Sequence, residues 1–182
     1  MCGIAGIVSL TGKPVINANI RINQMLKLLS NRGPDSSGKF ISKDGLVVLG
    51  NSRLAITDID SKFEVPFVSK NTNSVLAYNG ETFNFNLLKN DLKKRGVIFQ
   101  TSSDTEVVCE GLSNEGEMFL QKMDGFWGLA FYSLAHKRVL ISRDLMGEKP
   151  IFYLKNQDEF IFASSMNTIL EVMNKPKSID FS

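Results

Sequence analysis

The 182-residue chain contains only two cysteines, Cys2 and Cys109, and a single histidine, His136. Two thiols cannot build the disulfide framework on which small secreted domains depend. Together with one imidazole they also fall short of the four ligands of a structural zinc site. We therefore expect a reducing, cytoplasmic environment and no bound metal.

A strong charge bias and a long hydrophobic run are missing as well. The 21 basic and 19 acidic residues leave a formal net charge of +2, which does not favour nucleic acid or an anionic membrane as a partner. No apolar run approaches the roughly 18–20 residues that span a bilayer. The N-terminus lacks the basic flank and apolar block of a signal peptide. We expect no nucleic-acid partner and no membrane association.

The composition is that of one globular domain, with 43% hydrophobic and 22% charged residues. Apolar segments typical of strands occupy residues 2–8, 74–79, 128–134, 138–142, 151–154 and 160–163. The third and fourth are expected to form a hairpin with His136 in its turn. Helical periodicity occurs at residues 22–29 and 85–92. A third helix is expected to begin with Asp104 as its N-cap, and a fourth after Ser164 or Ser165.

This succession of elements predicts two packed sheets covered by helices on the outside. Cys109 falls among helix-type apolar positions and is expected to be a buried core thiol. Periodicity is lost near the C-terminus. We therefore expect residues 1–172 to form the domain and residues 173–182 to form an exit segment.

The opening octapeptide, MCGIAGIV, places Cys2 directly after the initiator methionine. Methionine is normally removed when the next residue is small, which would make Cys2 the N-terminal residue. Its thiol would then lie beside a free α-amine with a pKa of about 7.7–8.0. Such an amine can act as the base for its own side chain, as in N-terminal threonine nucleophiles. The alternative is that Cys2 is an ordinary strand residue.

Four polar segments interrupt the apolar pattern: the turn-rich loop NRGPDSSG, and GNSRLAITD, YNGETFN and SSDTE. Each has a structural explanation on its own. Asn79-Gly80 is a common turn, and Asp104 suits a helix cap. Arg53 can be paired or extend its head to solvent. Together with Cys2, however, the segments fit acyl transfer, which needs a nucleophile, a base and donors for an oxyanion.

The groups for this chemistry are all present in these segments. Asn79 has a side-chain N–H and Gly80 a backbone N–H, two adjacent donors for an oxyanion. The planar guanidinium of Arg53 suits a carboxylate. Asp104 supplies a counter-charge for an ammonium. A substrate with a carboxylate, an ammonium and a hydrolysable amide is a free amino-acid amide.

Eight motifs follow one another along the chain: MCGIAGIV, RGPDSSG, RLAI, YNGETFN, SDTEVV, DGFWGLAFYS, SRDLMGEKPIFY and FAS. This series resembles the class II glutamine amidotransferase domains, which are N-terminal-nucleophile hydrolases, and above all the glutaminase half of asparagine synthetases. The resemblance extends over nearly the whole chain, from Cys2 to Leu170. It implies an α+β fold, a four-layer αββα sandwich of two antiparallel sheets between helix layers. It also implies hydrolysis of L-glutamine through a thioester on Cys2.

The resemblance also assigns roles to individual residues. The catalytic residues, namely the nucleophile and the two oxyanion donors, would be Cys2, Asn79 and Gly80. The substrate-binding residues would be Arg53, Leu54, Ala55, Ile56, Thr57, Glu81 and Asp104. Among these, Arg53 would bind the α-carboxylate of glutamine, and Glu81 and Asp104 would lie at its α-amino group. Arg32 would stand near the site, mainly to organise its loop.

Three positions depart from the usual pattern of this family. Relatives often carry histidine at the positions of Asn31 and Asn51, and commonly glutamate at that of Ser165. None of the three is the nucleophile, an oxyanion donor or a substrate ligand. We therefore expect these departures to affect the geometry of a partner domain or subunit more than glutamine hydrolysis itself.

Asparagine synthetases continue into a domain with an SGGxDS phosphate loop, and this sequence contains neither that loop nor a G-x-x-x-x-G-K-[ST] motif. We therefore expect no cofactor in this chain, and ATP and Mg²⁺ only in that absent synthetase domain. The acceptor of the ammonia would be such a domain or a separate subunit. Two rival functions are a degenerate domain that only binds glutamine or assists assembly, and hydrolysis of another amide. The complete residue set argues against the first, and the pairing of Arg53 with Asp104 against the second.

Overall fold

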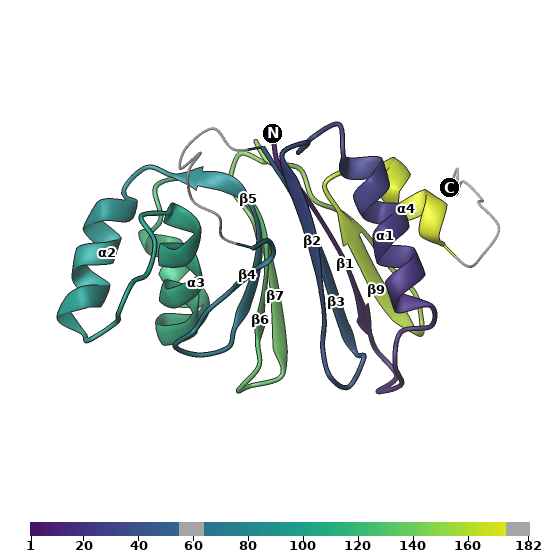
Figure 1. Ribbon diagram of the computed structural model, residues 1–182, viewed down its shortest axis with the longest axis horizontal. Helices are drawn as coiled ribbons and strands as arrows, with labels where there is room; N and C mark the ends of the chain where they lie inside the picture. The colour runs from purple at the N-terminus through teal and green to yellow at the C-terminus, as the bar shows by residue number, and fades with distance from the viewer. Residues whose placement is uncertain (55–63, 174–182) are drawn as a thin grey trace.

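The structure, a computed structural model, describes residues 1–54 and 64–173. Two antiparallel sheets are packed face to face, and helices cover the outer side of each sheet (Figure 1). The five strands of the first sheet, in spatial order, are β2 (Ser36–Ile41), β3 (Val47–Arg53), β1 (Gly3–Ser9), β9 (Glu159–Ala163) and β8 (Phe152–Lys155). The four strands of the second are β4 (Phe67–Val68), β5 (Val75–Thr82), β6 (Gly125–Ser133) and β7 (Arg138–Arg143).

Two helices lie on each outer face. The first sheet is covered by α1 (Ala18–Leu29) and α4 (Met166–Val172), and the second by α2 (Phe85–Lys94) and α3 (Asp104–Glu115). A 3₁₀ helix, η1 (Gly116–Lys122), continues from α3. The α+β, four-layer αββα sandwich expected from the sequence is confirmed. Among the described residues, no helix has the length and apolar character needed to cross a membrane.

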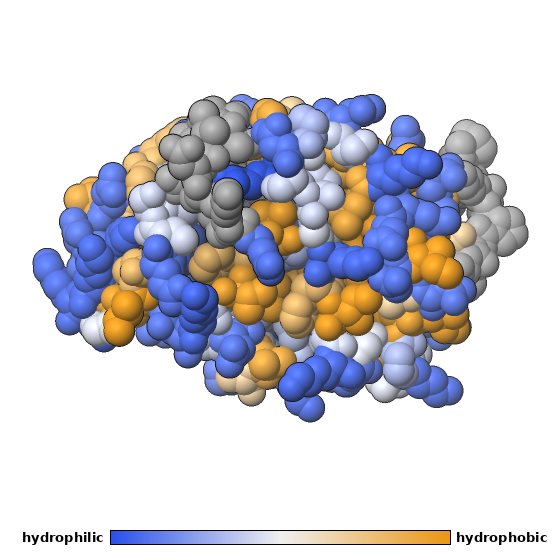
Figure 2. Space-filling model, viewed as in Figure 1, coloured by the Kyte–Doolittle hydropathy of each residue, from blue (hydrophilic) through white to orange (hydrophobic). Residues whose placement is uncertain are grey.

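Three apolar clusters separate the four layers. One lies between the first sheet and α1 with α4, and another between the second sheet and α2 with α3. The third fills the space between the sheets and includes Ile4, Leu49 and Ala77. Phe40 of β2 also meets Tyr132 of β6 there, with ring centroids 5.9 Å apart. In the view of Figure 2, hydrophobic surface gathers in the middle of the molecule, along the seam between the sheets.

Alternation of side chains along the strands brings the polar residues into one layer. Successive residues of a strand point to opposite faces of its sheet. Because Ile4, Leu49 and Ala77 face the inter-sheet layer, residues two positions away along each strand face it as well. Cys2 and Asn79 therefore project between the sheets, at the edge where β1 begins and β5 ends. Asn51 and Arg53 do so from β3, by the same alternation.

Most local predictions are confirmed. The β6–β7 hairpin turns through exposed His136, Cys109 is fully buried, and α4 follows Ser165. The prediction that Asp104 caps α3 was wrong. The N-cap is Ser103, whose hydroxyl accepts a hydrogen bond from the Thr105 N–H at 3.1 Å.

Asp104 is instead the first residue of α3, and its carboxylate turns toward the end of β5. A second difference lies in the NRGPDSSG segment, which is not a loop throughout. Its last residues belong to β2, which begins at Ser36 and pairs there with Arg53 of β3.

Candidate active site

A pocket of about 110 Å³ opens at the edge of the sandwich where β1 begins and β3 and β5 end. Every predicted site residue that the structure describes lines this pocket: Cys2, Arg53, Leu54, Asn79, Gly80, Glu81 and Asp104. The other three predicted residues, Ala55, Ile56 and Thr57, lie outside the described residues. Side chains that are up to 102 positions apart in the sequence are thus collected around one small cavity.

Cys2 is half-buried, and its position is held from two sides. The backbone N–H of Leu54 donates to Cys2 Sγ at 3.4 Å, and the thiol lies 3.7 Å from the Leu54 carbonyl oxygen. Arg32 Nε donates to the Cys2 carbonyl oxygen at 3.3 Å. These hydrogen bonds fix the start of β1 against the end of β3 and the loop of Arg32.

The loop that carries Arg32 is braced against the end of β3. A Cβ atom on Gly33 would lie 2.4 Å from the Ser52 carbonyl group, so only glycine permits this approach. The Asp35 N–H donates to the Arg53 carbonyl oxygen at 3.1 Å. This agrees with the expectation that Arg32 stands beside the site, on a loop fixed to the strand of Arg53.

Asn79 lines the pocket, and its side-chain donor has no partner among the described residues. The residue is only 2% exposed, and its Nδ2 is buried without a hydrogen-bond partner among the described residues. Burying such an N–H costs about 1–3 kcal/mol. In a native protein an unsatisfied buried group calls for an explanation, and a ligand that accepts from it is one.

Gly80 follows Asn79 where β5 runs close to β6. A Cβ atom at this position would lie 2.6 Å from the Phe126 carbonyl oxygen and 2.9 Å from the Trp127 Cα. Both atoms belong to the backbone of β6 and cannot move aside cheaply. Glycine is therefore required here for close strand packing, independently of any role of its N–H.

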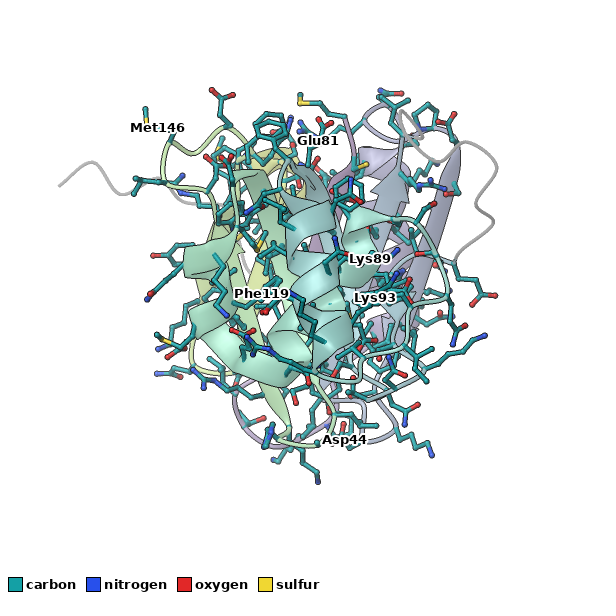
Figure 3. The ribbon with its side chains drawn as sticks, turned by 90° about the vertical axis from the view of Figure 1, so that its left-hand side faces the viewer. Asp44, Glu81, Lys89, Lys93, Phe119 and Met146 are labelled. Carbon is teal, nitrogen blue, oxygen red and sulfur yellow. The ribbon has the colours of Figure 1, made fainter. Side chains whose placement is uncertain are left out.

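Two carboxylates border the pocket, Glu81 from β5 and Asp104 from α3. Asp104 Oδ2 accepts a hydrogen bond from the Thr82 N–H at 3.0 Å. Burial raises the pKa of Asp104 above its ordinary value, although the hydrogen bonds from Thr82 and Thr105 oppose the shift. Glu81 is exposed, at the opposite end of the sandwich from Asp44 (Figure 3). A cation bound between these carboxylates would favour the ionised form of Asp104.

Neither a histidine nor an available tyrosine hydroxyl offers a base for the thiol among the described residues that line the pocket. The single histidine of the chain, His136, lies in the β6–β7 turn. Tyr78 lines the pocket, but burial raises the pKa of its hydroxyl well above the usual range. That hydroxyl is also engaged with Thr82 Oγ1 at 2.8 Å. The α-amine that removal of Met1 would create on Cys2 stays the predicted base.

The structure adds pocket residues that the sequence reasoning missed. Lys149 lines the pocket, with its Nζ 4.3 Å from the Phe126 ring centroid and 3.7 Å from Met1 Sδ. Lys149 and Phe126 belong to two of the motifs quoted above, SRDLMGEKPIFY and DGFWGLAFYS. Their contact, however, depends on how distant strands pair. Asn51, noted only as a departure from the family pattern, also lines the pocket.

The loop after β7 holds Lys149 in place. The buried Asp144 carboxylate accepts hydrogen bonds from the N–H groups of Trp127, Glu148 and Lys149 at 3.3, 2.9 and 3.1 Å. Burial tends to raise the pKa of Asp144, but these hydrogen bonds outweigh it and the pKa lies below the ordinary value. Within the same loop Met146 is 84% exposed and lies at the periphery of the molecule in Figure 3.

Across residues 1–54 and 64–173, no three His, Cys, Asp or Glu side chains cluster as metal ligands would.

Comparison with known proteins identifies the family. The sequence profile described as "Glutamine amidotransferase domain" matches residues 1–182. Asparagine synthetase 3 (glutamine-hydrolyzing) of Bacillus subtilis is 32% identical over 171 residues, which cover 93% of this chain and 27% of that protein. Asparagine synthetase B (glutamine-hydrolyzing) of Escherichia coli is 29% identical over 173 residues, covering 94% and 30% respectively. This chain thus spans less than a third of the length of either relative.

A solved structure shares the fold. Glutamine phosphoribosylpyrophosphate amidotransferase from B. subtilis, complexed with ADP and GMP, superposes with a TM-score of 0.75 at 22% identity. The alignment covers 94% of this chain and 43% of that one. The match to the family profile over the whole chain and the shared sandwich lead to one conclusion. This chain belongs to the glutamine amidotransferase domain family, in its class II branch.

Proposed function

We propose that this domain hydrolyses the side-chain amide of L-glutamine through a thioester on Cys2, releasing glutamate and ammonia. The observation that carries the proposal is that one pocket is lined by both Cys2 and Asn79, whose buried Nδ2 has no partner among the described residues. A nucleophile and an oxyanion donor are the two groups that acyl transfer requires. The volume of about 110 Å³ suits a ligand smaller than the drug-sized molecules that fill 300–1,000 Å³.

The charged groups around the pocket match the two ends of a free amino acid. Arg53 would bind the α-carboxylate, for which a planar guanidinium offers two parallel N–H donors. Asp104 and Glu81 would bind the α-ammonium. Its positive charge would offset the free-energy cost of burying the ionised Asp104 carboxylate. Holding both ends positions the side-chain amide against Cys2, and such orientation is itself a large part of catalysis.

The reaction then needs only the groups of Cys2 and the two donors. With Met1 removed, the α-amine of Cys2 accepts the thiol proton as Sγ attacks the amide carbon. The resulting oxyanion accepts hydrogen bonds from Asn79 Nδ2 and the Gly80 N–H. The amine returns the proton to the amide nitrogen, the C–N bond breaks, and ammonia leaves the thioester. A water molecule, deprotonated by the amine, attacks the thioester, so glutamate departs and the thiol is restored.

The ammonia would be used by a synthetase domain or subunit outside residues 1–182. The support for this part is that the relatives named above are asparagine synthetases more than three times as long as the aligned segment. Under this proposal residues 1–172 form the ammonia-producing domain and bind no cofactor. ATP and Mg²⁺ would belong to the acceptor domain alone.

The test is a glutaminase assay on protein whose intact mass shows that Met1 has been removed. We expect release of glutamate and ammonia without ATP, and no asparagine when ATP and aspartate are added. Cys2→Ala should abolish ammonia release, whereas Cys109→Ala, the matched control at the other cysteine, should stay within threefold of wild type. A Cys2→Ala variant with a tenth of wild-type activity would refute the thioester. Protein that retains Met1 should be inactive, because the Cys2 nitrogen is then an amide.

A further inference from the structure

Asn51 joins the two sheets directly beneath the pocket. It belongs to β3 of the first sheet, and its Nδ2 donates to the Gly3 carbonyl oxygen of β1 at 3.0 Å. Its Oδ1 accepts from the Tyr78 N–H of β5, in the second sheet, at 3.0 Å. The side chain is 2% exposed and lines the pocket. One amide group thus spans the inter-sheet layer, using both its donor and its acceptor.

The two backbone groups that Asn51 joins stand next to the reactive groups. Gly3 follows the nucleophile Cys2, and Tyr78 precedes the oxyanion donor Asn79. On this side of β5 the short strand β4 pairs only with Val75 and Leu76. Among the described residues no strand therefore lies beside the Tyr78 N–H on this side, and Asn51 supplies the acceptor that a buried N–H needs.

We infer that Asn51 is a positioning residue for glutamine hydrolysis, setting the spacing between the Cys2 strand and the Asn79 strand. The inference rests on the proposed function. Deeper in this layer the sheets meet through apolar side chains such as Ile4, Leu49 and Ala77, whose packing is not directional. Hydrogen bonds to both strands fix distance and register, and a displacement of about 1 Å between reacting groups costs roughly 10²-fold in rate.

The test compares substitutions of Asn51 in Met1-free protein. Asn51→Leu removes both hydrogen bonds at similar volume, and Asn51→Asp keeps the acceptor for Tyr78 but lacks the donor to Gly3. Asn51→His retains one donor and one acceptor when neutral. Ser52→Ala is the matched control, because Ser52 is equally buried on the same strand but alternation turns it to the α1 side with Val48 and Gly50.

Three quantities are measured for each variant: the melting temperature, the steady-state constants for glutamine, and the inhibition constant of L-glutamate γ-semialdehyde. That aldehyde adds the Cys2 thiol across its carbonyl group, forming a C–S bond, and the thiol proton goes to the former carbonyl oxygen. The inhibition constant of the aldehyde therefore depends on both the nucleophile and the oxyanion donors. Glutamine binding depends mainly on the charged ends of glutamine.

We expect Asn51→Leu and Asn51→Asp to lower kcat at least tenfold and to weaken aldehyde inhibition by a similar factor. The KM for glutamine should change less than threefold, Asn51→His should recover at least tenfold in kcat over Asn51→Leu, and Ser52→Ala should resemble wild type. A folded Asn51→Leu protein with a lower melting temperature but unchanged kcat and aldehyde inhibition would overturn the inference. So would a rise in KM alone. If Asn51→Leu does not fold, Asn51→Asp decides by the same criteria.

Failure of the proposed function gives a different pattern. Wild-type protein with free Cys2 would then release no ammonia and bind no aldehyde, before any variant is compared. In that case the role inferred for Asn51 is refuted together with the function. Active wild-type protein with kinetically normal Asn51 variants refutes the positioning role alone.

Discussion

Replacing Asn79 with leucine should separate catalysis from stability in this domain. Loss of one oxyanion donor typically lowers kcat by about 10²–10³, or about 2.7–4 kcal/mol of transition-state stabilisation. The same substitution removes a buried N–H that has no partner among the described residues, and whose burial costs about 1–3 kcal/mol. Leucine has a similar volume and brings no polar atom. Activity should therefore collapse while the free energy of unfolding stays constant or increases.

The assay pairs steady-state glutaminase kinetics with thermal melting. In a domain of this size, 1 kcal/mol corresponds to about 2–4 °C in Tm. We expect Asn79→Leu to leave Tm unchanged or a few degrees higher, with the KM for glutamine within threefold of wild type. Asn51→Leu is the matched control, because Asn51 has the same 2% exposure but uses both ends of its amide. Its Tm should fall by several degrees.

Two results would refute this reasoning. If Asn79→Leu lowers Tm as far as Asn51→Leu does, the Asn79 amide is a structural group of the fold. If kcat stays within threefold of wild type, Asn79 is not an oxyanion donor. Circular dichroism at the assay temperature would show that both variants are folded when their kinetics are compared.

Three further predictions concern substrate binding, pH and loop stability. Arg53→Ala should raise the KM for glutamine about 10–100-fold with a smaller change in kcat, because a carboxylate contact is present in the ground and transition states alike. Steady-state kinetics in which kcat falls and KM changes little would contradict this role of Arg53. Because burial raises the pKa of Asp104, its carboxylate protonates at a higher pH than an exposed carboxylate does. A profile of KM against pH should therefore show glutamine binding weakening as pH falls through that raised pKa. Asp144→Asn should lower stability by about 2 kcal/mol at neutral pH in thermal melts. Since the pKa of Asp144 is lowered in the folded protein, this difference should shrink as pH falls from the ordinary carboxyl pKa through the lowered one.

The sequence alone determined the features that depend on near neighbours in the chain. Strand alternation and turn residues predicted the β6–β7 hairpin, and helical spacing predicted that Cys109 is buried, since these patterns need only a few consecutive residues. Through the family resemblance, the order of the motifs predicted the four-layer sandwich and seven of the residues that line the pocket. Alternation also explains why Cys2 and Asn79 face the same layer once the two sheets are packed together.

Only the tertiary structure decided how those side chains are partnered. The sequence suggested Asp104 as a helix cap, but the end of β5, 22 residues away, attracts its carboxylate and leaves Ser103 to cap α3. Asn51 finds its two partners 48 and 27 residues away, on strands of different sheets. Hydrogen bonds over such separations depend on how the sheets pack, and no local pattern records them. For the same reason, only the tertiary structure reveals that the Asn79 Nδ2 has no hydrogen-bond partner among the described residues.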